Sequence, residues 1–337
     1  MPEIKIEIAR RLSFLESHRN HLCVDGDVHL TDISNLDDSI KKHLEQNQDY
    51  YHGKPLGIDS LFFEMMQSKV DMCLIWQNPA TTVYKGSSEE NFQSLLKANR
   101  YIYESVRKYP GKFIPGGWID PKIMFPDHCK ELVKILVKEF GFPIIKMNPA
   151  QNQFMIDSEI VFEFVEEIYN HGAIPAFHFG SDTEFTPAEG LERVVRFAGE
   201  RSIIAIHMGG GGAAYPAAEE TYQKARELGL RFPNLKYVLS AKRDTHIESD
   251  LISYELQGKP FSNNLICASD APYGKMVWNF EGFRGLFKSF QDKINHTDKR
   301  IRENPELFST ESIQNYLGGN MVQTAIDGYK SILSKID

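Results

Sequence analysis

A ten-residue stretch near the N-terminus, CVDGDVHLTD (residues 23–32), carries three aspartates and one histidine. It begins apolar and ends polar, which is typical of a buried strand that runs into a loop. Asp27 and His29 are two positions apart, so in a strand their side chains point to the same side. A carboxylate and an imidazole placed together are suitable ligands for one divalent ion. The alternative is structural: Asp27 closes the turn after Gly26, and His29 is a hydrogen-bonded core residue.

Short, almost continuously apolar segments recur along the chain, as expected for parallel strands buried on both faces. We predict eight strands, at 22–30, 72–77, 113–119, 142–147, 174–179, 202–208, 236–240 and 264–270. Helical patterns alternate with them, at 58–66, 88–108, 127–140, 157–170, 187–200, 216–229, 246–256 and 280–291. Eight such units predict an α/β fold, a (β/α)8 TIM barrel forming a single domain over 21–337, with 1–20 as an N-terminal extension packed on the barrel. An open doubly wound sheet is the alternative.

Ionisable residues gather at the ends of the predicted strands. In a (β/α)8 barrel, catalytic groups project from the C-terminal ends of the strands. In strands one, four, five, six and eight, the residues near this end are Asp27 with His29, Lys146, His178, His207 and Asp270. Chance could place an ionisable residue at the end of one or two strands. Ionisable residues at the ends of five strands favour a functional site.

Four of these side chains make a complete ligand set: Asp27, His29, His178 and Asp270. Two imidazoles and two carboxylates suit a divalent ion, and we expect Zn²⁺. Mn²⁺ and Fe²⁺ are alternatives, because two carboxylates make the site harder than one built from histidines. Each residue also has a structural interpretation: His178 as a hydrogen-bonded core histidine, and Asp270 as a turn residue at the end of its strand.

The composition of the 337-residue chain limits the class of partner. Hydrophobic residues make up 42% and charged residues 25%, as in ordinary globular proteins. The net charge of −8 argues against a general nucleic-acid or anionic-membrane surface. The sequence offers no signal peptide or membrane span, and its four cysteines form no CxxC pair. We therefore expect a cytoplasmic protein that binds a small-molecule substrate.

Taken together, the strand-end residues resemble the amidohydrolase superfamily, in particular its amidohydrolase-2 branch, which includes aminocarboxymuconate semialdehyde decarboxylase and various hydrolases. The resemblance runs from about residue 21 to the C-terminus. Its motifs, in order, are DGDVH (25–29), PAFHFG (175–180), HMGG (207–210), ASDAPYG (268–274) and YLGGNM (316–321). Many members have a histidine where this chain has Asp27. Some decarboxylases carry glutamate at this position and other members carry aspartate, so Asp27 is compatible with the ligand set of the branch.

The resemblance also implies roles for individual residues. It implies one metal ion, with His207 as an acid/base or polarising group over the substrate rather than a ligand. The alternative for His207 is a buried histidine that donates to a backbone carbonyl. Asp270 would both bind the metal and accept a proton from metal-bound water. Members of the branch commonly form homo-oligomers, so the resemblance also implies a possible homo-oligomer here.

Four further residues are candidates for substrate binding: Lys146, Arg243, Trp76 and His246. Lys146 would pair with a substrate anion, become a carbamate that bridges two metals as in other branches, or form a structural ion pair. Arg243 and His246, just past the seventh strand, would bind a substrate carboxylate or are surface loop residues. Trp76, like Trp118, lines the pocket or fills the barrel.

The main functional prediction is a metal-dependent hydrolase acting on a small ester, lactone or amide. The metal would activate a water molecule, Asp270 would accept its proton, and His207 would assist at the carbonyl or leaving group. The alternative is a non-oxidative, metal-dependent decarboxylase of a small aromatic or unsaturated carboxylate, in which Asp270 delivers a proton to carbon. A third interpretation is a catalytically degenerate binding barrel, against which the intact set of strand-end residues argues.

Overall fold

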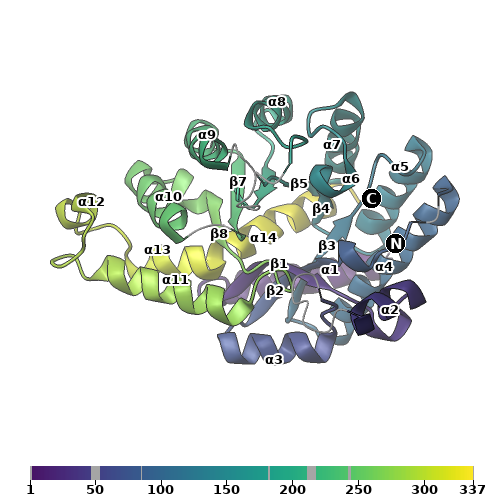
Figure 1. The fold of residues 1–337 in the computed structure, drawn as a ribbon, viewed down its shortest axis with the longest axis horizontal. Coiled ribbons are helices and arrows are strands. Elements are labelled where there is room, and N and C mark those ends of the chain that lie inside the picture. The colour runs from purple at the N-terminus through teal and green to yellow at the C-terminus, as the bar shows by residue number, and fades with distance from the viewer. Residues whose placement is uncertain are drawn as a thin grey trace.

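The computed structural model describes residues 2–46, 54–84, 86–180, 183–210, 218–241 and 244–336. Eight strands form one sheet in sequence order, each parallel to the next, with helices around the outside (Figure 1). The first strand also meets the chain that follows the last one, where Val28 pairs in parallel with Ala271. The sheet therefore forms a nearly closed (β/α)8 barrel. The predicted fold is confirmed, and the alternative of an open sheet is wrong.

All eight predicted strands are present, with small differences at their ends. Their bounds are β1 (Val24–Leu30), β2 (Met72–Gln77), β3 (Phe113–Trp118), β4 (Ile144–Met147), β5 (Ile174–His178), β6 (Ile203–Ile206), β7 (Leu235–Leu239) and β8 (Leu265–Cys267). Apart from His178, every strand residue is buried, which explains why the strands read as continuous apolar runs. The largest difference is at β8, predicted to reach Asp270. It stops at Cys267 because the chain turns there, with Asp270 in a left-handed conformation.

Helices follow the strands as predicted, and further helices occupy the insertions and the termini. Their bounds are α1 (Pro2–His18), α2 (Asp38–Gln46), α3 (Ile58–Ser68), α4 (Ser88–Lys108), α5 (Pro126–Lys134), α6 (Pro149–Asn152), α7 (Glu159–His171), α8 (Ala188–Ala198), α9 (Ala218–Arg231), α10 (Asp244–Gln257), α11 (Met276–Gln291), α12 (Lys299–Glu303), α13 (Thr310–Gln314) and α14 (Asn320–Leu333). The predicted helix at 127–140 divides into α5 and a π-helical turn, Ile135–Glu139. The beginning of the helix predicted at 216–229 lies outside the described residues.

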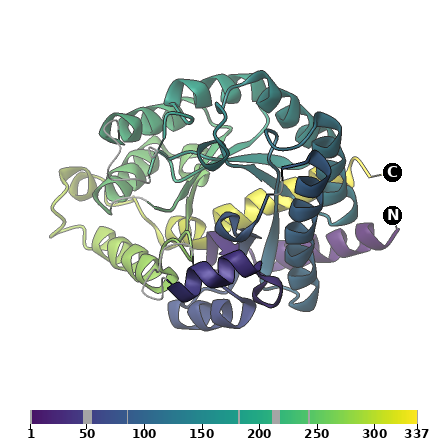
Figure 2. The ribbon, with the colours of Figure 1, turned by 45° about the vertical axis from the view of Figure 1, so that its right-hand side comes forward.

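The N-terminal helix α1 packs against the C-terminal helix α14, which Figure 2 shows crossing behind the barrel. The apolar side of α1 is buried through Ile4, Ile8 and Leu15. Lys330 Nζ on α14 lies 2.8 Å from a carboxylate oxygen of Glu16. The division into an extension at 1–20 and a domain at 21–337 stays a prediction. Across the described residues, no helix combines the length and the apolar character that crossing a bilayer requires.

The YLGGNM segment connects the C-terminal helix to both edges of the barrel. Gly318 lies so close to the chain before β1 that an added Cβ would be 1.9 Å from the Leu22 carbonyl oxygen. Asn320 Nδ2 donates to the backbone carbonyls of Ser262 at 3.1 Å and Leu265 at 2.8 Å. The segment therefore fixes the starts of β1 and β8, the two strands between which the barrel closes.

Inside the barrel, the indole of Trp76 on β2 lies over Gly116 on β3. A Cβ at Gly116 would be 2.1 Å from Trp76 Cε3, so any other residue displaces the ring. Trp76 is fully buried, and its Nε1 donates to Asp27 Oδ1 at 2.9 Å. The glycine thus makes room for a side chain that holds a carboxylate of the predicted site.

We expect Gly116→Ala to lower the free energy of unfolding by about 1–3 kcal/mol, because the new methyl group overpacks the barrel interior. Urea denaturation measures the change. Gly282→Ala is the matched control, since a Cβ at this exposed position of α11 meets nothing within 4 Å. The control should be neutral or more stable by about 0.5–1 kcal/mol. Equal stability of Gly116→Ala and the wild type would contradict the packing described.

Candidate metal centre

Three of the four predicted ligands lie together at the C-terminal ends of the strands. Asp27 and His29 project from β1, and Asp270 lies three residues beyond β8; one ligand atom of each is within 4.8 Å of the others. His29 Nε2 is 3.6 Å from Asp27 Oδ1 and 3.6 Å from Asp270 Oδ1. Two ligands about 2.1 Å from one ion in a tetrahedral arrangement are roughly 3.4 Å apart. The three side chains therefore fit a single divalent ion.

His29 presents the nitrogen that a metal needs. Its Nδ1 lies 3.0 Å from the backbone carbonyl oxygen of Gln77. A carbonyl only accepts, so Nδ1 carries the hydrogen and Nε2 keeps its lone pair, as in most metal-binding histidines. Burial, reinforced by the charge of Lys146, lowers the pKa of His29 to about 4, against the opposing effect of Asp27. The imidazole is therefore neutral near pH 7, the form that binds metal.

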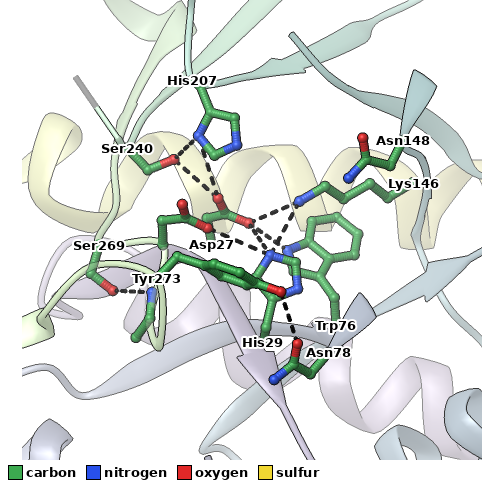
Figure 3. Close-up of polar contacts among 12 residues, drawn as sticks. Asp27, His29, Trp76, Asn78, Lys146, Asn148, His207, Ser240, Ser269 and Tyr273 are labelled. Atoms are coloured by element: carbon green, nitrogen blue, oxygen red, sulfur yellow. Dashed lines mark hydrogen bonds and ion pairs between the residues drawn. The ribbon is translucent and has the colours of Figure 1, made fainter. Parts of the chain in front are cut away.

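The carboxylate of Asp27 is fully buried and accepts from side chains on β2, on β4 and just after β7 (Figure 3). Its Oδ1 accepts from Trp76 Nε1 at 2.9 Å and from Lys146 Nζ at 3.2 Å. Its Oδ2 accepts from Ser240 Oγ at 3.0 Å. Burial alone would raise the pKa of Asp27, but the charge of Lys146 and its hydrogen bond outweigh burial and hold the pKa below the ordinary value. Asp27 is therefore ionised in the folded protein.

Asp270 is aimed at His29 by an unusual backbone conformation. Its φ of 61° is left-handed, which is uncommon for a residue with a Cβ and costs energy that the surroundings must supply. The Asp270 carbonyl accepts from the backbone nitrogens of Tyr273 at 2.7 Å and Gly274 at 2.8 Å. This tight turn, together with the hydrogen bond from His29 N to the Ala271 carbonyl at 2.7 Å, fixes the approach of the carboxylate.

Asp25 holds the backbone next to Asp27 and Asp270 in place through hydrogen bonds. Its Oδ1 accepts from the backbone nitrogens of Ser269 at 2.9 Å and Asp27 at 3.2 Å, and its Oδ2 contacts Ser269 Oγ at 2.5 Å. Burial raises the pKa of Asp25 to about 7, although these hydrogen bonds lower it. Asp25 thus ties the start of β1 to the turn after β8. It positions both carboxylates of the group formed by Asp27, His29 and Asp270, hereafter the ligand group.

His207 is connected to the ligand group through a serine. Its Nδ1 lies 2.8 Å from Ser240 Oγ. Because the Ser240 hydroxyl donates to Asp27, it accepts from His207, so Nδ1 carries the hydrogen. The φ of 76° at His207 is also left-handed, so a second strand ends in a strained residue facing the centre. The chain His207–Ser240–Asp27 fixes the orientation of an imidazole suited to acid/base work.

His178, the fourth predicted ligand, lies beside His207 instead. It is the last residue of β5, and its ring meets that of His207 edge-on, with centroids 4.6 Å apart. It does not join the group formed by the other three ligands among the residues the structure describes. Its role as a ligand stays a prediction.

The predicted substrate-binding residues divide between the centre and its surroundings. Lys146 and Trp76 are in the centre, and Trp118 lies beside them, its ring centroid 5.3 Å from Lys146 Nζ. His246 lies on α10 with its ring against Tyr222 of α9, at a centroid distance of 3.9 Å. Arg243 is outside the described residues. A substrate contact by any of these side chains remains a prediction.

Sequence reasoning missed the serines that organise the site. Ser240 is the last residue of the predicted strand 236–240, so the strand-end rule points to it, but serine is too common in such positions to stand out. Ser269 stands next to Asp270 and gave no signal of its own. Tyr273 was also missed; its hydroxyl donates to Asn78 Oδ1 at 3.0 Å, and its ring lies edge-on to His29, at a centroid distance of 5.5 Å.

No protein-family model matches the sequence, and neither does a curated protein. Solved structures match over nearly the whole chain. The 5-carboxyvanillate decarboxylase of Sphingomonas paucimobilis is 16% identical, with a TM-score of 0.62 over 90% of this chain and 98% of that one. A dihydroxybenzoic acid decarboxylase of Polaromonas with bound manganese and 2-nitroresorcinol is 14% identical, with a TM-score of 0.59 over 90% and 96%. An amidohydrolase II is 13% identical, with a TM-score of 0.57 over 90% and 99%.

These similarities are at the level of the fold. The matching structures include both the decarboxylases and the amidohydrolases of the branch that the strand-end motifs resemble. The predicted resemblance is therefore confirmed for the architecture. Which reaction the chain performs is a separate question, because one barrel supports many chemistries.

We expect His29→Ala to abolish binding of a divalent ion, with a loss larger than the roughly 10- to 100-fold typical of removing an outer-shell partner. Elemental analysis of the purified protein, after loading with Mn²⁺ or Zn²⁺, measures this. His246→Ala is the control and should retain the metal of the wild type. His178→Ala tests the fourth ligand and should also lose metal, whereas His207→Ala should keep it. Full metal content in His29→Ala would rule out this centre.

The raised pKa of Asp25 predicts how stability depends on pH. The folded protein keeps the proton up to about pH 7, whereas the unfolded chain releases it near its ordinary pKa of 3.8. Unfolding therefore releases a proton in this range, so the contribution of Asp25 to stability falls as pH rises from about 4 to about 7. Asp25→Asn stays neutral, so its stability relative to the wild type should increase as pH rises from about 4 to about 7. Urea denaturation of metal-free protein measures the difference.

Asp25→Ala is the control for the hydrogen bonds themselves. It leaves the backbone nitrogens of Ser269 and Asp27 without their acceptor, so it should be less stable than Asp25→Asn, which also does not titrate, by about 1–3 kcal/mol at every pH. A constant difference between the wild type and Asp25→Asn across the range would show that Asp25 does not titrate there.

Proposed function

We propose that the chain is a metal-dependent, non-oxidative decarboxylase of a small aromatic or unsaturated carboxylate, with one divalent ion held by Asp27, His29 and Asp270. The observation that carries the proposal is the buried ammonium of Lys146, 3.2 Å from Asp27 Oδ1. Together, Lys146 and a divalent ion carry one positive charge more than the two aspartates when both are ionised, and two more when Asp270 is protonated. Such a centre attracts an anion, and a carboxylate substrate supplies one.

The solved structures that share the fold support the same class of substrate. One is a 2,6-dihydroxybenzoate decarboxylase in complex with 2,6-dihydroxybenzoate, and two decarboxylase structures hold manganese. Two carboxylate oxygens and one imidazole also suit a harder ion than a histidine-rich site does. We therefore extend the expected Zn²⁺ to Mn²⁺ as an equal candidate.

In this proposal, the protein residues hold the substrate and move one proton. A divalent ion bound there would chelate a carboxylate or neighbouring hydroxyl oxygen of the substrate and polarise it. Asp270, in its protonated form, delivers a proton to the carbon that bears the carboxylate. The bond from this carbon to the carboxylate then breaks, its electron pair stays with the ring or alkene, and CO₂ leaves. Asp270 regains a proton from water, so the carboxylate and one proton are consumed in each turnover.

His207 and Lys146 are the two other residues that act on the substrate in this proposal. The hydrogen bond to Ser240 holds His207 in one tautomer and orientation, ready to contact the substrate. Lys146 contributes positive charge in a site shielded from water, where it acts more strongly than at the surface. Both residues bind and orient, and neither needs to change its protonation state in the reaction.

Hydrolysis of a small ester, lactone or amide is the second candidate, supported by the amidohydrolase among the structures that share the fold. The same side chains would serve it. Asp270, facing the ligand group, would accept a proton from water instead of giving one to carbon.

The test is to incubate Mn²⁺-loaded and Zn²⁺-loaded protein with a panel of hydroxybenzoates and a panel of lactones. Release of CO₂ with loss of the carboxylate is the expected result. Asp270→Asn should lower kcat by at least about 100-fold while keeping the fold, because it removes the proton donor. Gly282→Ala, at an exposed position of α11, should retain activity. Acid release from the lactones alone would favour the hydrolase, and metal and substrate binding without turnover of either panel would favour the binding barrel.

A further inference from the structure

The lysine at the end of β4 lies inside the ligand group rather than beside it. Lys146 Nζ is 3.2 Å from Asp27 Oδ1 and 3.5 Å from His29 Nε2, the atoms offered to a metal (Figure 3). Its side chain is 1% exposed. The ammonium also lies 5.1 Å from the ring centroid of Trp76 and 5.3 Å from that of Trp118, within reach of cation–π attraction to both. The position is therefore built to hold a positive charge.

We propose that Lys146 is a resident cation of the metal centre, which neutralises Asp27 while no metal is bound and lowers the affinity for the metal. The inference rests on the metal site of the proposed function. It differs from the roles expected for Lys146 as a substrate contact or a bridging carbamate, because here the unmodified ammonium competes with the ion for the same carboxylate.

The competition follows from the hydrogen bonds of Asp27. Its Oδ1 already accepts from Lys146 and Trp76, and its Oδ2 accepts from Ser240. An ion that binds either oxygen shares it with these donors. It also lies a few ångströms from the ammonium, and in a buried site two like charges at that distance repel strongly. Removal of the positive charge should therefore raise the affinity for a divalent ion.

The same residue stabilises the metal-free protein. Asp27 and Asp270 both approach His29 Nε2, each at 3.6 Å, so without a cation two carboxylates face one another across a buried imidazole. Breaking a buried ion pair by removing one partner is strongly destabilising, because a charge is left uncompensated. A neutral residue at position 146 should thus weaken the metal-free protein, and a bound metal should restore it.

The test compares the wild type with Lys146→Met, which keeps the apolar stem and removes the charge. Metal-free protein is titrated calorimetrically with Mn²⁺ and with Zn²⁺, and its melting temperature is measured with and without each ion. We expect the Kd for metal to fall by at least about ten-fold in Lys146→Met. The melting temperature without metal should fall, and the rise on adding metal should be larger than in the wild type.

Lys236→Met is the matched control. Lys236 is also buried, but it stands near the start of β7, at the opposite end of the barrel from the ligand group. Its loss should change the melting temperature equally with and without metal and leave the Kd for metal unchanged. Lys146→Gln, also neutral, provides the same comparison if Lys146→Met does not fold, and the same direction of change is expected.

Each result has a distinct meaning. Unchanged or weaker metal binding in both neutral variants would overturn the competition while leaving the proposed metal site intact. An intact mass showing one added CO₂ on Lys146 of the wild type would also overturn it, because a carbamate is not a cation. If neither ion binds the wild type or the variants, the proposed function itself fails.

Discussion

The buried carboxylate of Asp27 is the group on which the arrangement of the centre depends. An ionised carboxylate is costly to bury unless donors and an opposite charge surround it. Trp76 from β2, Lys146 from β4 and Ser240 after β7 meet this requirement, each by a direct hydrogen bond. One side chain of β1 therefore organises strands from both sides of the barrel, and through Ser240 it also orients His207. The proposed metal binding and the proposed acid/base role of His207 therefore both depend on this residue.

The closure of the barrel brings Asp270, the last predicted ligand, to this group from the far end of the sequence. Asp25 accepts from Ser269, and His29 N donates to Ala271, so hydrogen bonds flank Asp270 on both sides. Between these anchors the backbone adopts the left-handed conformation that turns the Asp270 carboxylate towards His29. Strain at this position is maintained by the fold because the same contacts close the barrel.

Much of the fold and part of the site could be predicted from the sequence. Strands buried on both faces are mostly apolar, so their number and order were recognisable, and the strand-end rule located Asp27, His29 and Asp270 on one rim. The partners of these residues could not be predicted, because the strand-end rule gives a position along the barrel but not which side chains face each other across it. That His178 lies beside His207, and Lys146 beside Asp27, is determined by the tertiary structure and not by the position of each residue in its strand. The serines were missed because a hydroxyl becomes informative only when its partner is known.

The central claim is that Asp27, His29 and Asp270 hold one divalent ion. Anomalous X-ray diffraction from crystals grown with Mn²⁺ tests it most directly, because the signal locates the metal independently of any activity. The predicted result is one anomalous peak at coordination distance from His29 Nε2 and from a carboxylate oxygen of each aspartate. A centre without a peak, with Lys146 still paired to Asp27, or a peak held by other residues, would contradict the claim.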